Sequence, residues 1–553
     1  MTEIDTTNTV RLIRQAHCFG EHDADAMLVD WPSLGALVAA RGRDQADQIF
    51  MRYFDDESSQ QAQYTYREFD ASVARIAAWL VDEFGIRAGQ AVATLAYNHP
   101  LAAATLFACW RIGAIAAPQN LHESDERIAY TLQDSSCVAL LALSDSADRA
   151  KAIAVLCGSS IAVATLRDPV EVKPLANDDT DFRHSPALIV YTSGTTGNPK
   201  GVVLTQYNLL INALGTTQVH EIDSATTLMC VLPVHHVNGI VVTLVATVLA
   251  GARVVLNRGF KVTTFWSCMA AEKVGIVSVV PTILQFLCEA DENIRPLDLA
   301  KFRHFICGAG TLAIALVERF ETRFGFPVIH GYGLSETTAF ACSMPLHMPR
   351  DARRYWLSGH GYPSIGAAFP HCEIAIHDAE GVAQAERSRG EIVVRGHYIM
   401  SGYHHRPDAN AETFKHGWFR TGDEGFFKNA DDGRAYFFIT GRIKELINRG
   451  GVKYSPFEIE EVLLEIPGVK VGLAIAFDND WYGEEVGAYV VRAVGSTVTA
   501  EEILNHCAMK LPFAKRPKVV VFGDEIPVTV TGKYQRLKLK FLFAEFQQTQ
   551  FRS

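Results

Sequence analysis

Apolar and polar positions along the chain follow two periods in alternation, which predicts strands that alternate with helices. Short apolar runs bounded by turn residues are typical of buried strands. Such runs lie at 91–95, 138–143, 187–191, 228–232, 252–256, 276–280 and 304–307. Apolar residues at helical spacing predict helices at 70–84 and 101–115. Together these segments predict an α/β fold with largely parallel, buried sheets.

The pattern changes after about residue 370. Short strands at 373–377, 390–395 and 436–440 are separated by Gly and Asp turns, which indicates a smaller β-barrel-like piece. The last stretch of the chain has the order helix, strand, strand, helix, strand, at 456–464, 469–476, 487–492, 500–510 and 519–522. We therefore expect a large N-terminal domain of stacked α/β sheets over residues 1–442 and a small α+β C-terminal domain over residues 443–553.

The chain has 553 residues, too many for one ordinary core, and 20% of them are charged, a normal balance for a folded protein. With 51 Lys and Arg against 62 Asp and Glu, the net charge of −11 argues against a general nucleic-acid binder. The N-terminus lacks the order of a secretion signal, and the most apolar stretch, 240–252, is too short to cross a bilayer. Eleven scattered cysteines without a C-x-x-C motif predict reduced thiols in the cytoplasm.

The segment 191–201 (YTSGTTGNPKG) follows directly on a predicted strand and has the sharpest chemical pattern. Glycines let backbone N–H groups approach an anion, hydroxyl groups donate hydrogen bonds to it, and an ammonium group adds charge. The segment supplies all three kinds of group: Gly194, Gly197 and Gly201; Thr192, Ser193, Thr195 and Thr196; and Lys200. This combination favours a polyphosphate site over a flexible surface turn. It is not a Walker A loop, because Gly201 follows Lys200 where that motif needs Ser or Thr.

The segment 191–201 resembles the signature of the adenylate-forming superfamily, which comprises acyl-CoA synthetases, adenylation domains of peptide synthetases and firefly luciferase. Further segments from Val231 to Lys533 match the family in its order, so the resemblance covers nearly the whole chain and is strongest to an acyl-CoA ligase. It implies that a carboxylate attacks the α-phosphorus of ATP, giving acyl-AMP and pyrophosphate, and that a thiol then attacks the activated carbonyl. The implied ligands are a small-molecule carboxylic acid, ATP, Mg²⁺ and CoA.

The segment 331–337 (GYGLSET) offers a flat aromatic face in Tyr332 and a hard oxygen ligand in Glu336. These residue types suit a purine ring and an Mg²⁺ ion held between phosphate groups. Taken alone, the segment is equally well a turn with a solvated glutamate. The resemblance implies the same two roles and a contact of Thr337 with the α-phosphate. It also places small residues against the nucleotide and the acyl group: Gly308, Ala309, Gly310, Gly331 and Gly333.

Four charged residues complete the site that the resemblance implies. Asp423 would bind the ribose diol, Arg442 would contact the nucleotide, and Lys444 would lie at the hinge about which a mobile small domain swings. Lys533 would enter the site during adenylation and stabilise charge on the carboxylate and the α-phosphate. Without the resemblance, Asp423 is an ordinary residue at the end of a loop and Lys533 is a solvent-facing lysine.

The acceptor thiol and the acid are less closely specified. The resemblance places Arg449, Gly450 and Gly451 on the path of the CoA pantetheine arm, although similar strings occur in enzymes that load a carrier protein. It implies an acyl pocket with His236 beside the carboxylate. The residues of that pocket are His235, His236, Asn238, Gly308 and Gly331.

Two adjacent arginines, Arg353 and Arg354, depart from the family pattern. They could pair with a second acidic group on the substrate, but a surface loop is the favoured interpretation. We expect a small or medium organic acid, because nothing in the sequence marks a long apolar tunnel. A carrier-loading enzyme, a luciferase-like oxygenase and a non-catalytic nucleotide-binding relative are the alternatives, and a monomer or homodimer is expected.

Overall fold

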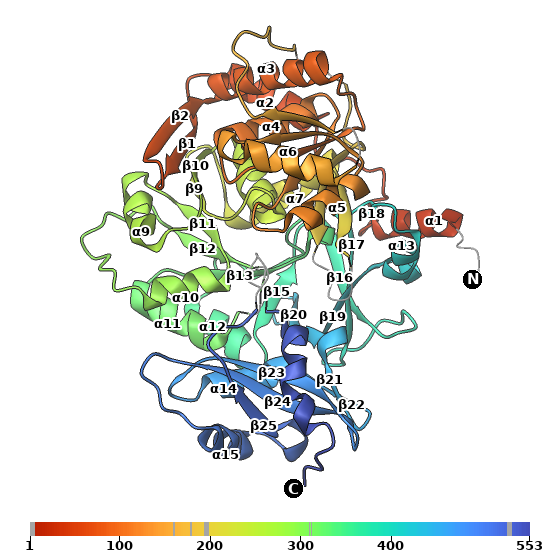
Figure 1. The fold of residues 1–553 in the computed structure, drawn as a ribbon, viewed down its shortest axis with the longest axis vertical. Helices are drawn as coiled ribbons and strands as arrows, with labels where there is room; N and C mark the ends of the chain where they lie inside the picture. Colours follow the sequence, from red (N-terminus) through yellow and green to blue (C-terminus); the bar gives the residue numbers. More distant parts are fainter. Residues whose placement is uncertain are drawn as a thin grey trace.

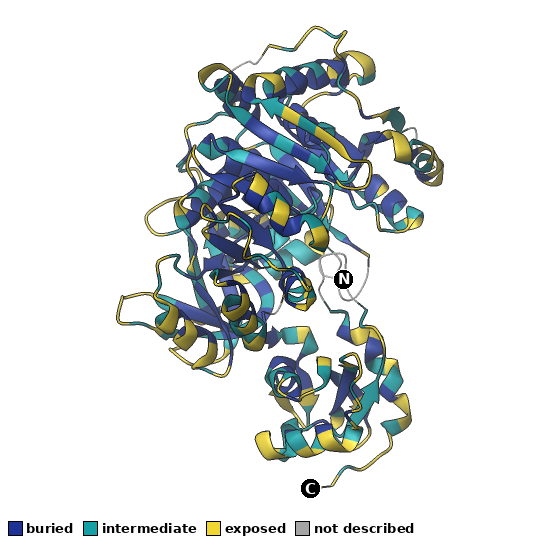
Figure 2. Ribbon diagram, turned by 90° about the vertical axis from the view of Figure 1, so that its left-hand side faces the viewer, coloured by how far each residue is buried: buried dark blue, intermediate teal, exposed yellow. Residues whose placement is uncertain are grey.

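The computed structural model describes residues 6–158, 161–176, 180–192, 198–308, 310, 312–527 and 534–552. Three β-sheets form the framework, and Figure 1 shows the smallest, built from the C-terminal strands in blue, at the lower end of the molecule. Buried residues concentrate on the strands, and exposed residues on loops and outer helix faces (Figure 2). This is the predicted α/β architecture with a small C-terminal domain, while the exact boundary at 442/443 stays a prediction.

The largest sheet has thirteen strands, and its strand pairing changes from parallel to antiparallel within one continuous sheet. Its parallel part contains β1 (Ile49–Asp55), β10 (Arg253–Asn257), β9 (Thr227–Cys230), β11 (Ile276–Val279), β12 (His304–Cys307) and β13 (Val328–Tyr332). Its antiparallel strands are β14 (Cys342–Ser343), β15 (Ser364–Ala368), β20 (Ala435–Arg442), β19 (Phe419–Asn429), β17 (Gly390–Gly396) and β16 (Cys372–His377), with β2 (Gln60–Thr65) at the other edge. The expected β-barrel-like piece is thus hydrogen-bonded to the large sheet as its extension.

The second sheet has seven strands, most of them parallel. In spatial order they are β18 (Gly402–Tyr403), β8 (Lys200–Thr205), β7 (Pro186–Thr192), β4 (Ile115–Gln119), β3 (Ala91–Leu95), β5 (Cys137–Ala142) and β6 (Ala162–Thr165). Every residue of β3 is buried, as expected of a central parallel strand that is covered on both faces. The pairing of β18 with β8 joins two segments that lie far apart in the sequence.

The helix expected at 101–115 is wrong at its C-terminal end. Helix α4 (Pro100–Arg111) begins with a proline at its first position and ends before Gly113. The φ angle of Gly113 is +69°, and a Cβ there would lie 2.5 Å from the ring of Phe182. Only glycine satisfies both conditions, so the chain turns at this point and continues as β4.

Helices cover the faces of the two larger sheets (Figure 1). They are α1 (Thr6–Ala16), α2 (Leu34–Asp44), α3 (Tyr66–Phe84), α5 (Asp125–Asp134), α6 (Ala147–Leu156), α7 (Gln206–His220), α9 (Val262–Ala271), α10 (Pro281–Glu289), α11 (Ile314–Phe324), α12 (Arg350–Ser358) and α13 (Pro407–Thr413). The apolar stretch 240–252 forms most of a π-helix (Asn238–Val245) and then α8 (Ala246–Ala250), both largely buried. Among the described residues, no helix combines the length and apolar character that a membrane crossing requires.

The C-terminal sheet is covered on both faces. Its strands are β22 (Val452–Tyr454), β21 (Ile447–Arg449), β24 (Gly483–Arg492), β23 (Val469–Asn479) and β25 (Val519–Phe522). Helices α14 (Pro456–Leu464) and α15 (Ala500–Lys510) contribute to one apolar cluster, and the 3₁₀ segment Arg536–Phe546 contributes to a second. Alternate residues of β23 enter the two clusters, as the two-residue period of a strand requires.

A buried arginine joins the C-terminal segment to the turn between the domains. Arg536 Nη1 donates to Glu445 Oε2 at 2.9 Å, and its Nε and Nη2 donate to the two carboxylate oxygens of Glu460 at 2.9 and 2.8 Å. Glu445 lies in the 3₁₀ turn Ile443–Glu445, which also contains Lys444. Charge-assisted bonds in a buried setting hold geometry firmly, so Arg536 fixes the segment after residue 533 against this turn.

Two histidines stack in the interior between α7 and β12. His220 and His304 are 0% and 1% exposed, and His220 Nδ1 lies 3.1 Å from His304 Nε2. Burial lowers the pKa of His220 to about 3 and the pKa of His304 to about 2, from the usual 6.5. Both imidazoles are therefore neutral in the folded chain at any pH above 5.

We expect the free energy of unfolding to fall as the pH falls from 7 to 5. Below pH 6.5 the unfolded chain binds protons at these two histidines and the folded chain does not, which favours unfolding. The contribution of the neutral histidines to the free energy of unfolding is therefore complete above pH 6.5 and is lost as the pH falls towards 3. Each accounts for about 2 kcal/mol of the loss at pH 5. Urea titrations at pH 7 and pH 5 measure this loss in the free energy of unfolding.

The variant His304→Gln should weaken the pH dependence of stability, whereas the control His184→Gln, at an exposed position, should not. An undiminished pH dependence in His304→Gln would contradict the assignment.

Candidate active site

The predicted site residues divide into those that the structure describes and those that it does not. Outside the described residues lie Ser193, Gly194, Thr195, Thr196, Gly197, Ala309 and Lys533, so their roles stay predictions. Several of the described residues gather in two contact networks. One surrounds Glu336 and the other surrounds Asp423.

Glu336 lies in a short 3₁₀ turn after β13. The Tyr403 hydroxyl donates to Glu336 Oε1 at 2.8 Å, and Lys200 Nζ lies 4.1 Å from the centre of the Tyr403 ring. Tyr403 is held there because β18 pairs with β8, the strand that begins at Lys200. Thr192 lies opposite Lys200 in the β7–β8 pair, and its hydroxyl is 3.5 Å from Lys200 O. Carboxylate, phenol and ammonium groups therefore meet at the ends of the predicted phosphate segment.

The electrostatics of this network suit an anion. Burial lowers the pKa of Lys200, and the negative charge of Glu336 opposes that shift. Lys444 and Arg406 lower the pKa of Lys200 further, so three cations influence one another here, although Arg406 is also paired with Asp134. Burial and the nearby Glu336 raise the pKa of Tyr403 far above its usual value, so Tyr403 remains a hydrogen-bond donor. A bound phosphate would relieve the mutual repulsion of the cations.

Asp423 lies within strand β19, not at the end of a loop as the sequence suggested. Asp423 belongs to a strand because it pairs with Arg442 of the neighbouring strand β20. The Tyr332 hydroxyl donates to Asp423 Oδ2 at 2.6 Å, and Arg442 Nε lies 3.2 Å from Asp423 Oδ1. Asp423 is 1% exposed, and within the described part of the chain its Oδ1 accepts no hydrogen bond. This buried oxygen therefore has the capacity to accept one from a ribose hydroxyl.

The same network fixes Tyr332 and Arg442. Burial and the charge of Asp423 raise the pKa of Tyr332 well above its usual value, so Tyr332 stays a phenol. The charge of Asp423 also raises the pKa of Arg442, which remains a cation. The hydrogen bond from the Tyr332 hydroxyl sets the orientation of the ring that is predicted to face the purine.

Thr337 is buried in the turn that carries Glu336. Its Oγ1 accepts the Leu334 N–H at 2.9 Å. The next residue, Thr338, has a φ of +64°, a strained value that its Oγ1 supports by donating to Tyr398 O at 2.7 Å. The hydroxyl of Thr337 thus shapes this turn, and its predicted contact with the α-phosphate stays a prediction.

Three glycines of the predicted site lie where a side chain would collide. A Cβ on Gly333 would lie 1.6 Å from a backbone oxygen. A Cβ on Gly308 or Gly331 would lie 2.9 or 2.6 Å from the ring of Phe340. The Phe340 ring therefore occupies the space beside both glycines of the predicted acyl pocket. At Gly310 the nearest atoms to a Cβ are 3.6 Å away, an ordinary contact distance.

His235 and His236 lie side by side just before the π-helix, with ring centres 4.8 Å apart. His235 Nε2 is buried and has no hydrogen-bond partner among the described residues. Burial lowers the pKa of His235 well below its usual value, so the imidazole is neutral. Asn238, the first residue of the π-helix, accepts a hydrogen bond from the Ser278 hydroxyl at 2.8 Å. A neutral imidazole nitrogen with unused capacity makes His235 a second candidate, beside His236, for contact with the acid.

Asn98 orders the loop that carries these histidines. The Val234 N–H donates to Asn98 Oδ1 at 2.8 Å, while Asn98 Nδ2 donates to Leu232 O and Asn257 O, both at 3.0 Å. Neither Asn98 nor Tyr403 was identified as a site residue from the sequence. Both act through contacts between segments that are distant along the chain, and the local sequence does not indicate these partners.

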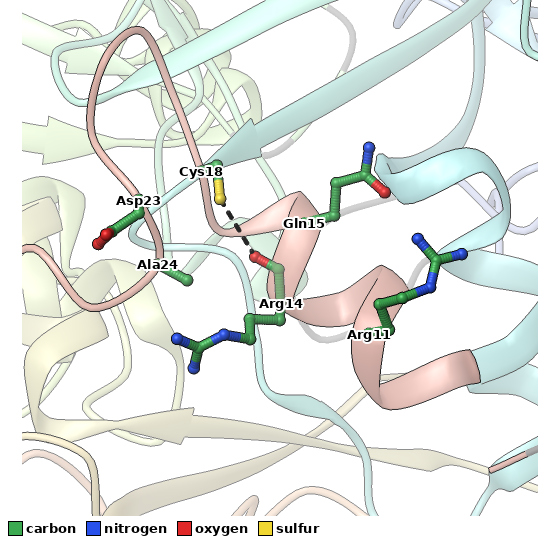
Figure 3. A pocket seen from close by; sticks show the side chains of 6 residues that line it. All are labelled: Arg11, Arg14, Gln15, Cys18, Asp23 and Ala24. Atoms are coloured by element: carbon green, nitrogen blue, oxygen red, sulfur yellow. Dashed lines mark hydrogen bonds between the residues drawn. The ribbon is translucent and has the colours of Figure 1, made fainter. Parts of the chain in front are cut away.

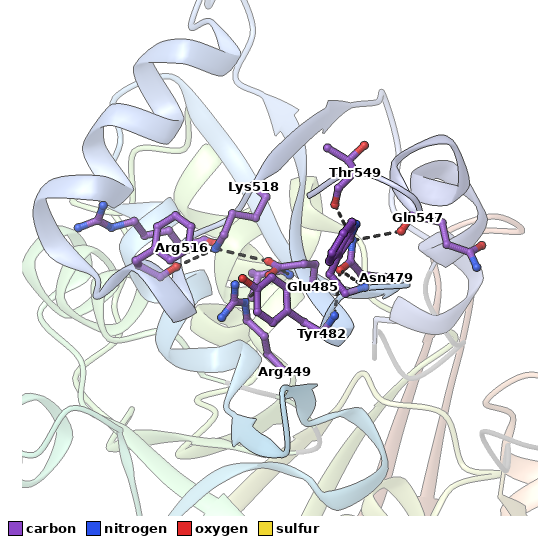
Figure 4. Close-up of polar contacts among 11 residues, drawn as sticks. Arg449, Asn479, Tyr482, Glu485, Arg516, Lys518, Gln547 and Thr549 are labelled. Atoms are coloured by element: carbon purple, nitrogen blue, oxygen red, sulfur yellow. Dashed lines mark hydrogen bonds and ion pairs between the residues drawn. The ribbon is translucent and has the colours of Figure 1, made fainter. Parts of the chain in front are cut away.

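Arg449 is engaged inside the small domain. It forms an ion pair with the fully buried Glu485, and its guanidinium lies 3.8 Å from the centre of the Tyr482 ring. Figure 4 shows these side chains gathered with Lys518, whose Nζ lies 3.4 Å from Glu485 Oε2. Burial lowers the pKa of Lys518 to about 8. The predicted contact of Arg449 with CoA stays a prediction, and the structure adds a packing role.

Two further predicted features lie at turns. Gly450 and Gly451 form the turn between β21 and β22 with φ of +59° and +85°, values that favour glycine. Lys444 lies in the 3₁₀ turn between β20 of the large sheet and β21 of the small one, a position that suits a hinge. Their roles in CoA entry and domain rotation stay predictions.

The surface-loop interpretation of Arg353 and Arg354 is wrong, because the segment forms helix α12. Arg353 is buried with Trp356 and Leu357, which follow it at helical spacing. Arg353 Nη2 lies 3.1 Å from Glu321 Oε1, and Arg354 Nε lies 3.0 Å from a carboxylate oxygen of Glu318. Both partners belong to α11, so these arginines tie two helices together.

Comparisons with known proteins place the chain in a family. The AMP-binding enzyme family model matches residues 38–404, and the AMP-binding enzyme C-terminal domain model matches residues 458–533. The chain is 34% identical over 485 residues to an oxalate–CoA ligase of Arabidopsis thaliana, which covers 85% of this chain and 92% of the relative.

Two solved structures agree over nearly the whole fold. ATP-bound MatB from Rhodopseudomonas palustris has a TM-score of 0.83 at 25% identity, covering 94% of this chain and 100% of that one. MenE from Bacillus subtilis, an o-succinylbenzoate CoA synthetase in complex with its acyl-adenylate intermediate, has a TM-score of 0.78 at 26% identity, covering 91% and 97%. With both family models matched, this chain belongs to the AMP-binding enzyme family.

Proposed function

We propose that this chain is an ATP-dependent acid–CoA ligase that activates a small carboxylic acid as acyl-AMP, releases pyrophosphate and transfers the acyl group to the sulfur of CoA. Family membership and the match to a CoA ligase over almost its full length support the reaction class. The observation that carries the proposal is the short stretch from Tyr332 to Glu336, which joins the Asp423 network to the Lys200 network. The Asp423 carboxylate and the Lys200 cluster, joined in this way, suit the ribose and the phosphates of one nucleotide.

In the first half-reaction the described residues bind and orient ATP. Asp423 Oδ1 accepts a hydrogen bond from the ribose, the Tyr332 ring lies against the purine, and Lys200 attracts the phosphates. The substrate carboxylate attacks the α-phosphorus, and the bond from that phosphorus to the pyrophosphate oxygen breaks. Lys533 stabilises the charge that develops in this step. No protein nucleophile is needed, because the attacking oxygen belongs to the substrate.

Glu336 suits an Mg²⁺ ion. Mg²⁺ prefers hard oxygen ligands and commonly binds through one or two carboxylates together with substrate phosphates. Glu336 offers a partly exposed carboxylate that the Tyr403 hydroxyl orients. Within the described ranges, no three His, Cys, Asp or Glu side chains form a ready-made metal cage, which is consistent with a site completed by phosphates. When bound, the ion would neutralise phosphate charge.

In the second half-reaction the small domain turns about Lys444 and brings CoA to the acyl-AMP. Contacts between the domains include the Tyr362 hydroxyl donating to Glu458 at 3.2 Å and Lys470 Nζ lying 3.6 Å from Glu289 Oε2. The Lys470–Glu289 pair is partly exposed, and ion pairs of this kind break at low cost, which favours rotation.

Phe340 limits the size of the acid. Its ring fills the space beside Gly308 and Gly331, the two glycines that are expected to border the acyl group. The ring is 4% exposed, and the Phe340 carbonyl accepts a hydrogen bond from Asn212 at 3.0 Å, so its backbone is held in place. A filled pocket of this kind favours a short acid over a long or bulky one.

Phe340→Ala should therefore shift the preference towards larger acids. Removing the ring opens volume beside both glycines, and we expect the ratio of kcat/KM for benzoate over acetate to rise at least about tenfold. Thioester formation over a graded series of acids measures the ratio. The exposed Phe286→Ala is the matched control and should leave the ratio unchanged. A folded Phe340→Ala variant with the wild-type ratio would show that the ring does not face the acid.

A panel of carboxylic acids with ATP, Mg²⁺ and CoA tests the function as a whole. We expect AMP and pyrophosphate in equal amounts and a thioester of the mass expected for at least one short acid. AMP release without a thioester would point to a carrier protein as the acceptor. ADP in place of AMP would refute the proposed reaction.

A further inference from the structure

The N-terminal strap, residues 6–23, lies across the large domain. It comprises helix α1 and the loop that follows it. Figure 1 shows α1 beside α13, and α1 also packs against β17. The family model begins only at residue 38, so the strap lies outside the matched part of the chain.

The N-terminal strap contacts the segment 397–403 through polar groups. His17 Nε2 lies 3.2 Å from Met400 O, and His397 Nε2 lies 2.9 Å from Asp23 O. A carbonyl oxygen only accepts hydrogen bonds, so His17 donates here with its proton on Nε2. Burial lowers the pKa of His17, which keeps the imidazole neutral.

The segment 397–403 in turn holds Glu336. The Met400 N–H donates to Glu336 O at 2.9 Å, and the Tyr403 hydroxyl donates to Glu336 Oε1 at 2.8 Å. Tyr398 O accepts the hydroxyl of Thr338, in the same turn, at 2.7 Å. The Met400 carbonyl therefore accepts a hydrogen bond from the strap, while the Met400 N–H donates one to Glu336 of the candidate site.

Another part of the strap borders a shallow surface hollow of about 370 Å³, whose lining side chains Figure 3 shows. The lining residues are Arg11, Arg14, Gln15, Cys18, Asp23 and Ala24. Arg11 donates to Asn8 within the helix at 2.9 Å. Arg11 lies on α1, which ends just before His17, so it offers a control position within the strap.

We propose that the N-terminal strap positions Glu336, with His17 as the positioning residue that acts through Met400. The His17 bond fixes the Met400 carbonyl, the Met400 N–H fixes the backbone of Glu336, and Tyr403 fixes the carboxylate. Without the His17 bond the carboxylate would sample several orientations and hold Mg²⁺ less well, since groups behind a metal ligand set its geometry. This inference rests on the proposed role of Glu336 as an Mg²⁺ ligand.

Three variants test it: His17→Ala removes the donor, His17→Gln restores an N–H donor of similar reach, and Arg11→Ala is the control. Calorimetric titration measures ATP binding with and without Mg²⁺. His17→Ala should weaken binding about fivefold with Mg²⁺ present, the effect of one lost hydrogen bond, and leave binding without Mg²⁺ unchanged. The Mg²⁺ concentration for half-maximal pyrophosphate release should rise by a similar factor. Transfer from preformed acyl-AMP to CoA should keep its wild-type rate, and His17→Gln should recover most of the loss.

Two results would overturn the inference. One is a His17→Ala variant with wild-type Mg²⁺ dependence. The other is an equal loss in both half-reactions with a lowered Tm, which is what a purely structural role predicts. Glu336→Gln, measured alongside, separates the two proposals. If it leaves the Mg²⁺ dependence unchanged, the metal role of Glu336 is wrong and this inference falls with it. If it removes the dependence while His17→Ala does not, only the strap inference falls.

Discussion

Replacement of Lys533 by alanine is expected to slow acyl-AMP formation about 10²- to 10³-fold, as loss of one group that stabilises transition-state charge does. A flexible ammonium group can follow the charge as it develops on the carboxylate and the α-phosphate. A preformed acyl-AMP should still pass its acyl group to CoA, because the proposed rotation withdraws Lys533 before that step. Single-turnover consumption of ATP measures the first half-reaction, and thioester formation from synthetic acyl-AMP measures the second.

The control for this experiment is Lys538→Ala, since Lys538 is an exposed lysine on the same C-terminal segment. Both half-reactions should keep their wild-type rates in that variant. Adenylation by Lys533→Ala at the wild-type rate would show that the role assigned to Lys533 is wrong. A loss of equal size in both half-reactions would indicate damage to the small domain instead.

Asp423→Asn should raise the KM for ATP about 10- to 100-fold, because a hydrogen bond to a charged group contributes more than one between neutral groups. The 2′- and 3′-hydroxyls of the ribose are not bonded to the reacting phosphorus, which is attached through the 5′ oxygen, so kcat should change less. The variant also leaves the Arg442 charge without its partner, so its Tm should fall. ATP–pyrophosphate exchange over a range of ATP concentrations measures KM, and thermal unfolding measures Tm.

Tyr332→Phe is the matched control for this prediction. It removes the hydroxyl that donates to Asp423 Oδ2 but keeps the aromatic face and the charge of Asp423. Its KM for ATP should rise by a smaller factor than that of Asp423→Asn. An unchanged KM in folded Asp423→Asn would mean that the carboxylate does not bind the ribose.

Buried strands were the most predictable part of the fold. Strands β3 and β12 span the same residues as apolar runs in the sequence, because such runs bounded by turns have few alternatives. The errors lie where a local pattern competes with tertiary contacts. Apolar residues continue past Gly113, so the sequence pattern does not mark where α4 ends. The packing of Gly113 against the Phe182 ring determines that end. Asp423 lies in a polar stretch that becomes a strand only through its pairing with β17 and β20.

The same division applies to the candidate site. Tyr332 and Glu336 lie in one contiguous motif, so the sequence alone proposes them as site candidates, and their roles stay predictions. Tyr403 and Asn98 contact the site across long stretches of sequence, and a single sequence gives no signal for such pairs. His17 precedes every recognisable motif, so only its contact with Met400 draws attention to it.

The bonds of Arg536 to Glu445 and Glu460 have a mechanical consequence for the proposed cycle. Three residues of extended chain reach about 11 Å, so the Cα atom of Lys533 can lie no farther than that from the Cα atom of Arg536, whose side chain is bonded to Glu445, the residue after Lys444. In the proposed cycle, Lys533 would therefore move together with the turn that contains Lys444, and one rotation of the small domain would decide which half-reaction can proceed. Under that proposal, acyl-AMP formation and acyl transfer exclude each other within one molecule, without a separate gate.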